Sequence, residues 1–410
     1  MIPAVCASII EKRIEMIRLL TCMLAMTAIS LLAGCDNQGK SASAPSTIEA
    51  TAGDSSAVVS FPMESNVEYW LFYAPSNSLT STNFNTVAGG KVITNAVSPQ
   101  VVAGLANGTT YYFTINGRTN NGPGGSGTPL VSATPRPAGN AWNLRPSLIA
   151  SDLRGAAFGT TFVVVGANGA MFSTLDGVSW TPINYVVTND LNAVFYGNGR
   201  YVAVGAGGVA LTSTDATTWA AVSSGTANNL YAGASNGAVH LAVGTSGTFT
   251  VSADGQTWGL GSTGTSSDLY GVAFGNGLWV SVGANGVIVT STDTANWQAV
   301  ASQTSSDLKA VTYSATAATF VAVGAGGTVV TSPDGVNWTA RAPISSTTLT
   351  GVGFGSQFAA VGNNGGIYVS ADGINWQAAP SGTTSNLNTV AFGNFRFLAA
   401  GAAGTNLYAN

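Results

Sequence analysis

The chain has 410 residues, which is enough for two or three domains. Charged residues make up only 7% of it and glycine accounts for 52 residues, a composition typical of short strands and tight turns rather than of charged surface helices. The formal net charge of -4 has the wrong sign for a phosphate backbone, so we expect no nucleic-acid partner.

The first 35 residues have the layout of an export signal. A short positive start at Arg18 is followed by an apolar segment over residues 19–32 and by Leu-Ala-Gly-Cys at 32–35. This ending resembles the bacterial lipobox, and the resemblance implies that Cys35 is lipidated and begins the mature chain. Several acyl chains would hold the protein on a membrane. We therefore expect a protein lipid-anchored to the cell membrane or outer membrane, in the periplasm or at the surface.

Two alternatives remain open at this end of the chain. The translation start is either Met1 or Met16, and the segment could also be an ordinary secretory signal with an incidental cysteine. The other two cysteines, Cys6 and Cys22, also precede the folded part, so no disulfide is expected within it.

A small domain is predicted over residues 47–134, after a flexible tether at 36–46. Its residues 105–111, Leu-Ala-Asn-Gly-Thr-Thr-Tyr, resemble the signature around the tyrosine corner of fibronectin type III domains. The resemblance implies a β-sandwich. Three aromatic residues are better explained as core than as a ligand-stacking surface: Tyr69, Trp70 and Tyr73.

The remainder, residues 139–410, is built of repeats. Tryptophan recurs every 38–41 residues, at positions 142, 180, 219, 258, 297, 338 and 376. Each repeat reads as four short antiparallel strands separated by glycine and asparagine turns, the pattern of a propeller blade. The last repeat lacks its tryptophan strand, which residues 139–146 would supply. The predicted fold is therefore all-β: a fibronectin type III-like β-sandwich followed by a seven-bladed β-propeller closed by its N- and C-terminal strands.

A short motif precedes six of these tryptophans. The segments resemble the Asp box of bacterial sialidases and, more closely, the BNR-like repeats of photosystem II assembly factors; the first, 173–180, is one residue longer than the others. We expect each carboxylate to accept backbone N–H groups of its own turn, a structural role. The aspartates are Asp176, Asp215, Asp254, Asp293, Asp334 and Asp372.

The chemical inventory argues against an enzyme. A sialidase-like site needs an arginine cluster and a glutamate, yet residues 139–410 contain no glutamate and their arginines occupy non-equivalent repeat positions. His240 is the only histidine, and it aligns with aromatic residues of the other repeats, so we predict a core position. We accordingly expect no catalytic residues, no cofactor and no metal-ligand set, while calcium held by turn oxygens stays open.

One position of the repeat varies while its neighbours do not: the residue after the leucine that opens each blade. It reads Arg154, Asn192, Tyr231, Tyr270, Lys309, Thr350 and Asn388. In a propeller this position lies near the channel mouth, where cations, aromatic rings and amides could grip a peptide or glycan. The alternative is that these are tolerant rim positions.

Three functions are compatible with the sequence. The first is a non-enzymatic binding or scaffold module for a protein or glycan of the cell envelope. The second is an assembly factor for an envelope complex, and the third is a degenerate sialidase-like glycan hydrolase.

Overall fold

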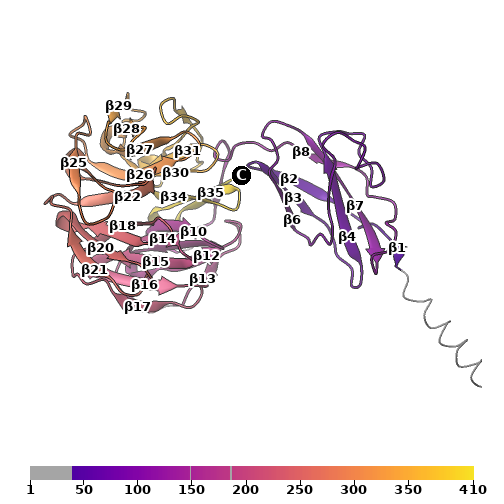
Figure 1. The fold of residues 1–410 in the computed structure, drawn as a ribbon, viewed down its shortest axis with the longest axis horizontal. Helices are drawn as coiled ribbons and strands as arrows, with labels where there is room; N and C mark the ends of the chain where they lie inside the picture. Colours follow the sequence, from indigo (N-terminus) through magenta and orange to yellow (C-terminus); the bar gives the residue numbers. More distant parts are fainter. Residues whose placement is uncertain (1–38, 148, 185–186) are drawn as a thin grey trace, which may run out of the picture. The chain divides into compact units, whose positions relative to one another are not determined.

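The computed structural model describes residues 39–410 with the exception of 148 and 185–186. The predicted export signal and its Cys35 lie outside the described residues. Within them, all regular structure is β-strand apart from three-residue 3-10 turns, which confirms the all-β class. None of the described residues belongs to a helix long and apolar enough to cross a membrane. The chain divides into two compact units (Figure 1).

The first unit comprises the described part of Met1–Thr51 together with Ala57–Ala103 and Gly108–Thr134. One sheet has the order β1-β7-β4-β5 with β8 also on β7, and the other has the order β2-β3-β6. The strands are β1 (Lys40–Ala42), β2 (Glu49–Gly53), β3 (Ser56–Ser60), β4 (Glu68–Ala74), β5 (Lys91–Ile93), β6 (Gln100–Ala103), β7 (Tyr111–Thr119) and β8 (Val131–Ala133).

Two details of this unit bear on the sequence-based expectations. Tyr69 and Tyr73 are buried, as expected of core residues, and Trp70 is half-buried beneath the guanidinium of Arg118 at 3.5 Å. Residues 40–42, expected within a flexible tether, instead pair as β1 with the edge of β7. The tether prediction was wrong there because an unpaired strand edge offers hydrogen bonds that a polar segment can take.

The second unit, which contains Pro135–Asn410, is a succession of four-stranded sheets, seven among the described residues. We name them blades 1 to 7. Blade 1 contains β10 (Leu153–Phe158), β11 (Phe162–Gly166), β12 (Met171–Thr174) and β13 (Thr181–Pro182). Blade 2 contains β14 (Leu191–Gly197), β15 (Arg200–Gly205), β16 (Val209–Ser213) and β17 (Ala220–Ser223). Blade 3 contains β18 (Leu230–Ser235), β19 (His240–Gly244), β20 (Thr248–Ser252) and β21 (Gly259–Ser262).

Blade 4 contains β22 (Leu269–Gly275), β23 (Leu278–Gly283), β24 (Ile288–Ser291) and β25 (Gln298–Val300). Blade 5 contains β26 (Leu308–Ser314), β27 (Thr319–Gly324), β28 (Val329–Ser332) and β29 (Thr339–Ala340). Blade 6 contains β30 (Leu349–Phe354), β31 (Phe358–Gly362), β32 (Ile367–Ser370) and β33 (Gln377–Ala378). Blade 7 contains β34 (Leu387–Gly393), β35 (Arg396–Gly401), β36 (Asn406–Ala409) and β9 (Trp142–Arg145).

Blade 7 is assembled from segments far apart in the sequence. Its outermost strand β9 pairs antiparallel with β36, with Leu144 opposite Leu407 and Asn143 opposite Tyr408. The first strand of each blade also contacts the first strand of the next, and β34 of blade 7 contacts β10 of blade 1. Bulky residues of adjacent blades form the core between them, as where Val194, Tyr201 and Trp219 pack with Val163 of the preceding blade.

Side-chain bonds also join neighbouring blades. The turn between the second and third strands of a blade presents a backbone N–H at a left-handed residue such as Asn285 (φ 54°). An Asp or Asn just before the opening leucine of the next blade accepts it at 2.8–3.0 Å. The six acceptors are Asp152, Asp190, Asn229, Asp268, Asp307 and Asn386.

The junction between blades 5 and 6 differs. Thr348 occupies the acceptor position there, and among the described residues no side chain accepts a bond from Gly326, the matching turn residue. Replacing Thr348→Asp is expected to supply the seventh bond and raise the free energy of unfolding by about 1 kcal/mol. Urea denaturation measures this, with Ser346→Asp as a control of equal charge. A Thr348→Asp variant no more stable than the control would contradict the interpretation.

Candidate functional site

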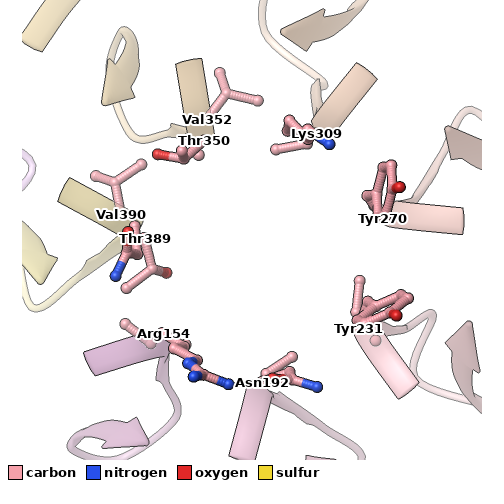
Figure 2. A pocket seen from close by; sticks show the side chains of 18 of the residues that line it. Arg154, Asn192, Tyr231, Tyr270, Lys309, Thr350, Val352, Thr389 and Val390 are labelled. Atoms are coloured by element: carbon pink, nitrogen blue, oxygen red, sulfur yellow. Dashed lines mark hydrogen bonds between the residues drawn. The ribbon is translucent and has the colours of Figure 1, made fainter. Parts of the chain in front are cut away.

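The seven variable positions of the repeat line a single cavity of about 190 Å³ at one end of the channel between the blades. Figure 2 shows Arg154, Asn192, Tyr231, Tyr270, Lys309 and Thr350 arranged around it, and Asn388 completes the set. All seven are half-buried. We call this set the rim and the cavity the channel mouth. The structure therefore brings together the residues that the sequence placed at equivalent repeat positions.

A β-bulge in the first strand of each blade sets the direction of these side chains. In every blade the pairing of first and second strand shifts by one residue immediately after the opening leucine, and the rim residue is the extra one. In blade 4, for example, Leu269 faces Gly283 and Gly271 faces Val282, which leaves Tyr270 unpaired. Such a bulge redirects a side chain out of the sheet pattern. This bulge was not predicted from the sequence. The only sign of it in the sequence is that the residue at this position varies from repeat to repeat.

Four rim residues form a polar arc tied to neighbouring blades. Asn192 Nδ2 donates to Leu230 O at 2.9 Å, and Asn388 Nδ2 donates to Leu153 O at 2.8 Å. The Thr350 hydroxyl donates to the carbonyl of Leu387 in the same way. Arg154 Nη1 lies 2.8 Å from Asp190 Oδ2 and donates to Asn192 Oδ1 at 3.0 Å. These bonds join neighbouring blades, so part of the hydrogen-bonding capacity of the four side chains is used within the propeller.

The other three rim residues form an aromatic arc on blades 3, 4 and 5. The rings of Tyr231 and Tyr270 lie 5.6 Å apart and tilted by 52°. Lys309 Nζ lies 3.8 Å from the centre of the Tyr270 ring and 3.0 Å from Asp307 Oδ2. The contacts in this arc are made by ring faces and a cation, the groups that commonly carry recognition at protein interfaces.

The ionisation states at the mouth follow from these contacts. Burial raises the pKa of the Tyr270 hydroxyl, and the carboxylates of Asp268 and Asp307 raise it further, so the hydroxyl stays protonated at neutral pH. The pKa of Asp307 is lowered by the backbone N–H of Asn285 and by Lys309. The Asn168 N–H, together with Arg154, lowers the pKa of Asp190, so both carboxylates are ionised.

The six Asp-box aspartates lie in the turns between third and fourth strands, at the ends of the strands opposite the mouth. In each, Oδ1 accepts two backbone N–H groups of its own turn at 2.7–2.9 Å. The N–H groups of Thr257 and Gln256 lower the pKa of Asp254 to about 2. These carboxylates are thus engaged within their own turns and do not converge on one place.

The first Asp box corrects one sequence reading. The hydroxyl that bonds the carboxylate belongs to Thr174, at 3.1 Å from Asp176 Oδ1, and Gly177 N donates to the same hydroxyl at 2.9 Å. Thr174 thus stands where the other boxes carry serine. The segment has no extra residue because the box begins at Thr174 and not at Ser173.

His240 lies in the interior of blade 3, not among the residues that line the mouth. It is fully buried, 6.1 Å from the ring of Phe195 and 6.4 Å from that of Trp258, and neither ring nitrogen has a hydrogen-bond partner in the described part of the chain. Burial lowers its pKa, and the nearby Arg200 lowers it further. The aligned residues of the other blades, such as Phe162 and Trp279, are buried as well. The described residues include no group of three or more His, Cys, Asp or Glu side chains placed to hold a metal ion.

Comparison with known proteins relates the second unit to propellers. No protein-family model matches the chain, and no curated protein does. Among solved structures, YCF48 bound to a D1 peptide covers 66% of this chain and 94% of its own, with 18% identity and a TM-score of 0.55. The match to YCF48 from Cyanidioschyzon merolae covers 65% of this chain and 98% of the YCF48 chain, with 20% identity and a TM-score of 0.54.

The WD40 β-propeller domain of Doa1 is similar to a comparable extent. It covers 66% of this chain and 97% of its own, with 11% identity and a TM-score of 0.56. At such identities the likeness concerns the fold alone, and it identifies the repeat region as a β-propeller.

Proposed function

We propose that the protein is a non-enzymatic cell-envelope lipoprotein whose propeller binds a protein partner at the channel mouth. The observation that carries the proposal is the aromatic arc, in which Tyr231, Tyr270 and Lys309 from three blades meet beside one cavity. Tyrosine is enriched where protein surfaces associate, because it offers a large rigid ring and a hydroxyl at little entropic expense.

In this proposal the protein has three parts in chain order: a lipid anchor, a small β-sandwich domain and a propeller. Cys35 is the lipid anchor, residues 47–134 form a fibronectin type III-like β-sandwich, and residues 139–410 form a seven-bladed propeller. Pairing of β9 with β36 closes the ring of blades. The small domain then acts as a spacer between membrane and propeller.

The size of the mouth favours a macromolecular partner. A cavity of about 190 Å³ is smaller than the 300–1,000 Å³ typical of small-molecule sites. It has room for a side chain projecting from a partner, while the surrounding rim contacts the partner's backbone. An assembly factor for an envelope complex is a specific form of this function, and the peptide bound by YCF48 supports it.

A glycan hydrolase is less well supported. The Asp-box carboxylates are hydrogen-bonded within their own turns, and His240 is enclosed in a blade. A glycan-binding role would also use ring stacking on Tyr231 and Tyr270, and it differs from the proposal in the chemical class of the partner.

Site-specific photocrosslinking in membranes of the native host tests the proposal. A photoreactive phenylalanine analogue at Tyr231 is expected to capture a protein, whereas the same analogue at Val336, which is exposed on an Asp-box turn, is expected not to capture it. Mass spectrometry identifies the adduct. The proposal would be abandoned if Val336 captured the same protein as efficiently, or if Tyr231 captured only glycan.

The recovered partner allows a quantitative test. Replacing Tyr231, Tyr270 and Lys309 together by alanine is expected to weaken its binding by about 2–4 kcal/mol, on the order of 30- to 1,000-fold, because buried tyrosines dominate interface energies. The control replaces three exposed apolar residues elsewhere, Leu175, Val178 and Val336, by alanine. Calorimetry of both triple variants should show a loss for the first only; equal affinities would contradict the assignment.

A further inference from the structure

Four aspartates precede the opening leucines of blades 1, 2, 4 and 5, each two positions before a rim residue of the channel mouth. Two of them are neutralised, since Asp190 pairs with Arg154 at 2.8 Å and Asp307 pairs with Lys309 at 3.0 Å. The other two, Asp152 and Asp268, form no ion pair with any residue that the structure describes; each accepts only a backbone N–H from the preceding blade. The mouth therefore retains two uncompensated negative charges.

One of these charges lies beside the aromatic arc. Asp268 directly precedes the opening leucine of blade 4, and its Oδ1 accepts the backbone N–H of Ser246 at 2.9 Å. Tyr270 already has the ammonium of Lys309 over its ring at 3.8 Å. The ring of Tyr231 has no such cation among the described residues; its hydroxyl accepts a bond from Thr245 at 3.3 Å. Because Thr245 and Ser246 are consecutive, Tyr231 and the Asp268 carboxylate bond to the same turn. An aromatic ring near an uncompensated carboxylate attracts a cation.

The remaining cations on this side of the blades lie towards the periphery. Arg145 is in β9, an outermost strand, and Arg341 follows β29, the outermost strand of blade 5. Arg341 Nε donates to Thr331 at 2.9 Å. Neither arginine is among the residues that line the channel mouth, so four aspartates stand against only two cations, Arg154 and Lys309, at the rim positions and directly before the opening leucines.

We propose that the partner segment held by the channel mouth is basic: an extended peptide whose lysine or arginine side chain enters beside Tyr231 and Asp268. This inference rests on the proposed function and specifies the chemistry of its partner. A guanidinium or ammonium would contact the Tyr231 ring and the Asp268 carboxylate together. Asp152 would draw a second basic residue towards blade 1. Complementary charge of this kind raises association rate and specificity.

The chain offers charge variants that preserve its structure. Asn229 and Asn386 occupy the same position as Asp152 and Asp268 and accept the same backbone bond, at 2.8 and 3.0 Å. Asp152→Asn/Asp268→Asn therefore removes both uncompensated charges and keeps both bonds between blades. Asn229→Asp/Asn386→Asp adds two charges at the mouth in the same way. Asp254→Asn, at the far ends of the strands, removes one charge and keeps an acceptor for the N–H groups of its turn.

The probe is a fluorescent dodecapeptide of alternating glycine and lysine, with glutamate and serine versions and chitohexaose for comparison. Fluorescence anisotropy in about 20 mM salt, where screening is weak, is expected to show the lysine peptide binding the wild type. Each carboxylate removed should weaken binding about two- to fivefold and each one added should strengthen it by a similar factor. Asp254→Asn should leave binding unchanged, and Tyr231→Ala should weaken it. The differences should shrink at about 200 mM salt.

Three results would overturn the inference: equal binding of the glutamate peptide, identical affinities across the charge series, or preferential binding of chitohexaose. The first two leave the proposed function intact if Tyr231 still captures a protein in the crosslinking experiment. Preference for chitohexaose together with no protein captured at Tyr231 would reject both.

Discussion

Removing residues 139–146 is expected to destabilise the propeller by at least about 3–5 kcal/mol and to make it prone to aggregate. These residues carry β9, which pairs with β36 from Trp142 opposite Ala409 to Arg145 opposite Asn406. Trp142 lies 6.1 Å from the ring of Phe397, and its indole N–H donates to Gly139 O at 2.6 Å. Loss of a packed tryptophan alone usually accounts for this magnitude. The exposed edge of β36 would in addition become available to other chains.

Thermal denaturation and size-exclusion chromatography measure the effect. A matched control replaces residues 142–145 by a glycine-serine segment of equal length, so that the connection to the first unit is preserved. Both variants should lose stability, because the strand and not the length of the connection is responsible. A deletion variant with the melting temperature of the wild type would refute the role of β9 in closing the propeller.

The variant His240→Phe is expected to be more stable than the wild type and to lose its pH dependence between about pH 7 and pH 5. Folding depresses the pKa of His240 below its usual 6.5, chiefly through burial. As the pH falls below 6.5 the unfolded chain takes up a proton that the folded chain refuses, so the wild type loses stability in this window. Both ring nitrogens also lack partners among the described residues, and an unsatisfied buried polar group destabilises by about 1–3 kcal/mol.

Urea denaturation at several pH values separates this effect from that of the Asp boxes. The charged groups near the imidazole are Arg200 and Asp254. Asp254 has a pKa of about 2, below its usual value, so its contribution to stability is lost only as the pH falls from about 4 towards 2. Phe358 of blade 6 aligns with His240 of blade 3. Introducing Phe358→His into the His240→Phe variant should restore a pH dependence of the free energy of unfolding like that of the wild type. If His240→Phe kept the wild-type slope between pH 7 and 5, another group would be responsible.

The repeated elements were predictable because their causes are local. Tryptophan spacing, glycine-asparagine turns and alternating residue size each depend on a few neighbouring residues, and together they indicated four strands per repeat. The aspartates of the boxes bond the turns that contain them, as in Asp254 with Gln256 and Thr257. The buried environment of His240 followed from its alignment with aromatic residues of other repeats.

The features that sequence reasoning missed depend on register and on distant partners. The bulge at Tyr270 exists only because Leu269 and Gly271 pair with adjacent residues of the next strand, which composition does not encode. The bond from Asn388 to Leu153 joins positions 235 residues apart. Bonds of this kind distinguish a polar arc, which joins blades, from an aromatic arc, whereas the prediction from sequence treated all seven rim residues alike. The misplaced start of the first Asp box shows the same limit, since threonine and serine were not recognised as equivalent donors.

The two ends of the propeller complete one blade through β9 and β36, and disulfide trapping tests this pairing directly. Asn143 and Tyr408 face each other across β9 and β36, so cysteines at both positions should bond on mild oxidation. We expect the oxidised double variant to migrate faster in a non-reducing gel and to be stabilised by up to about 5 kcal/mol. The control pair Gln377→Cys/Tyr408→Cys, which joins outer strand β33 of blade 6 to blade 7, should not bond. Failure of the first pair to close, or closure of both pairs alike, would contradict the account.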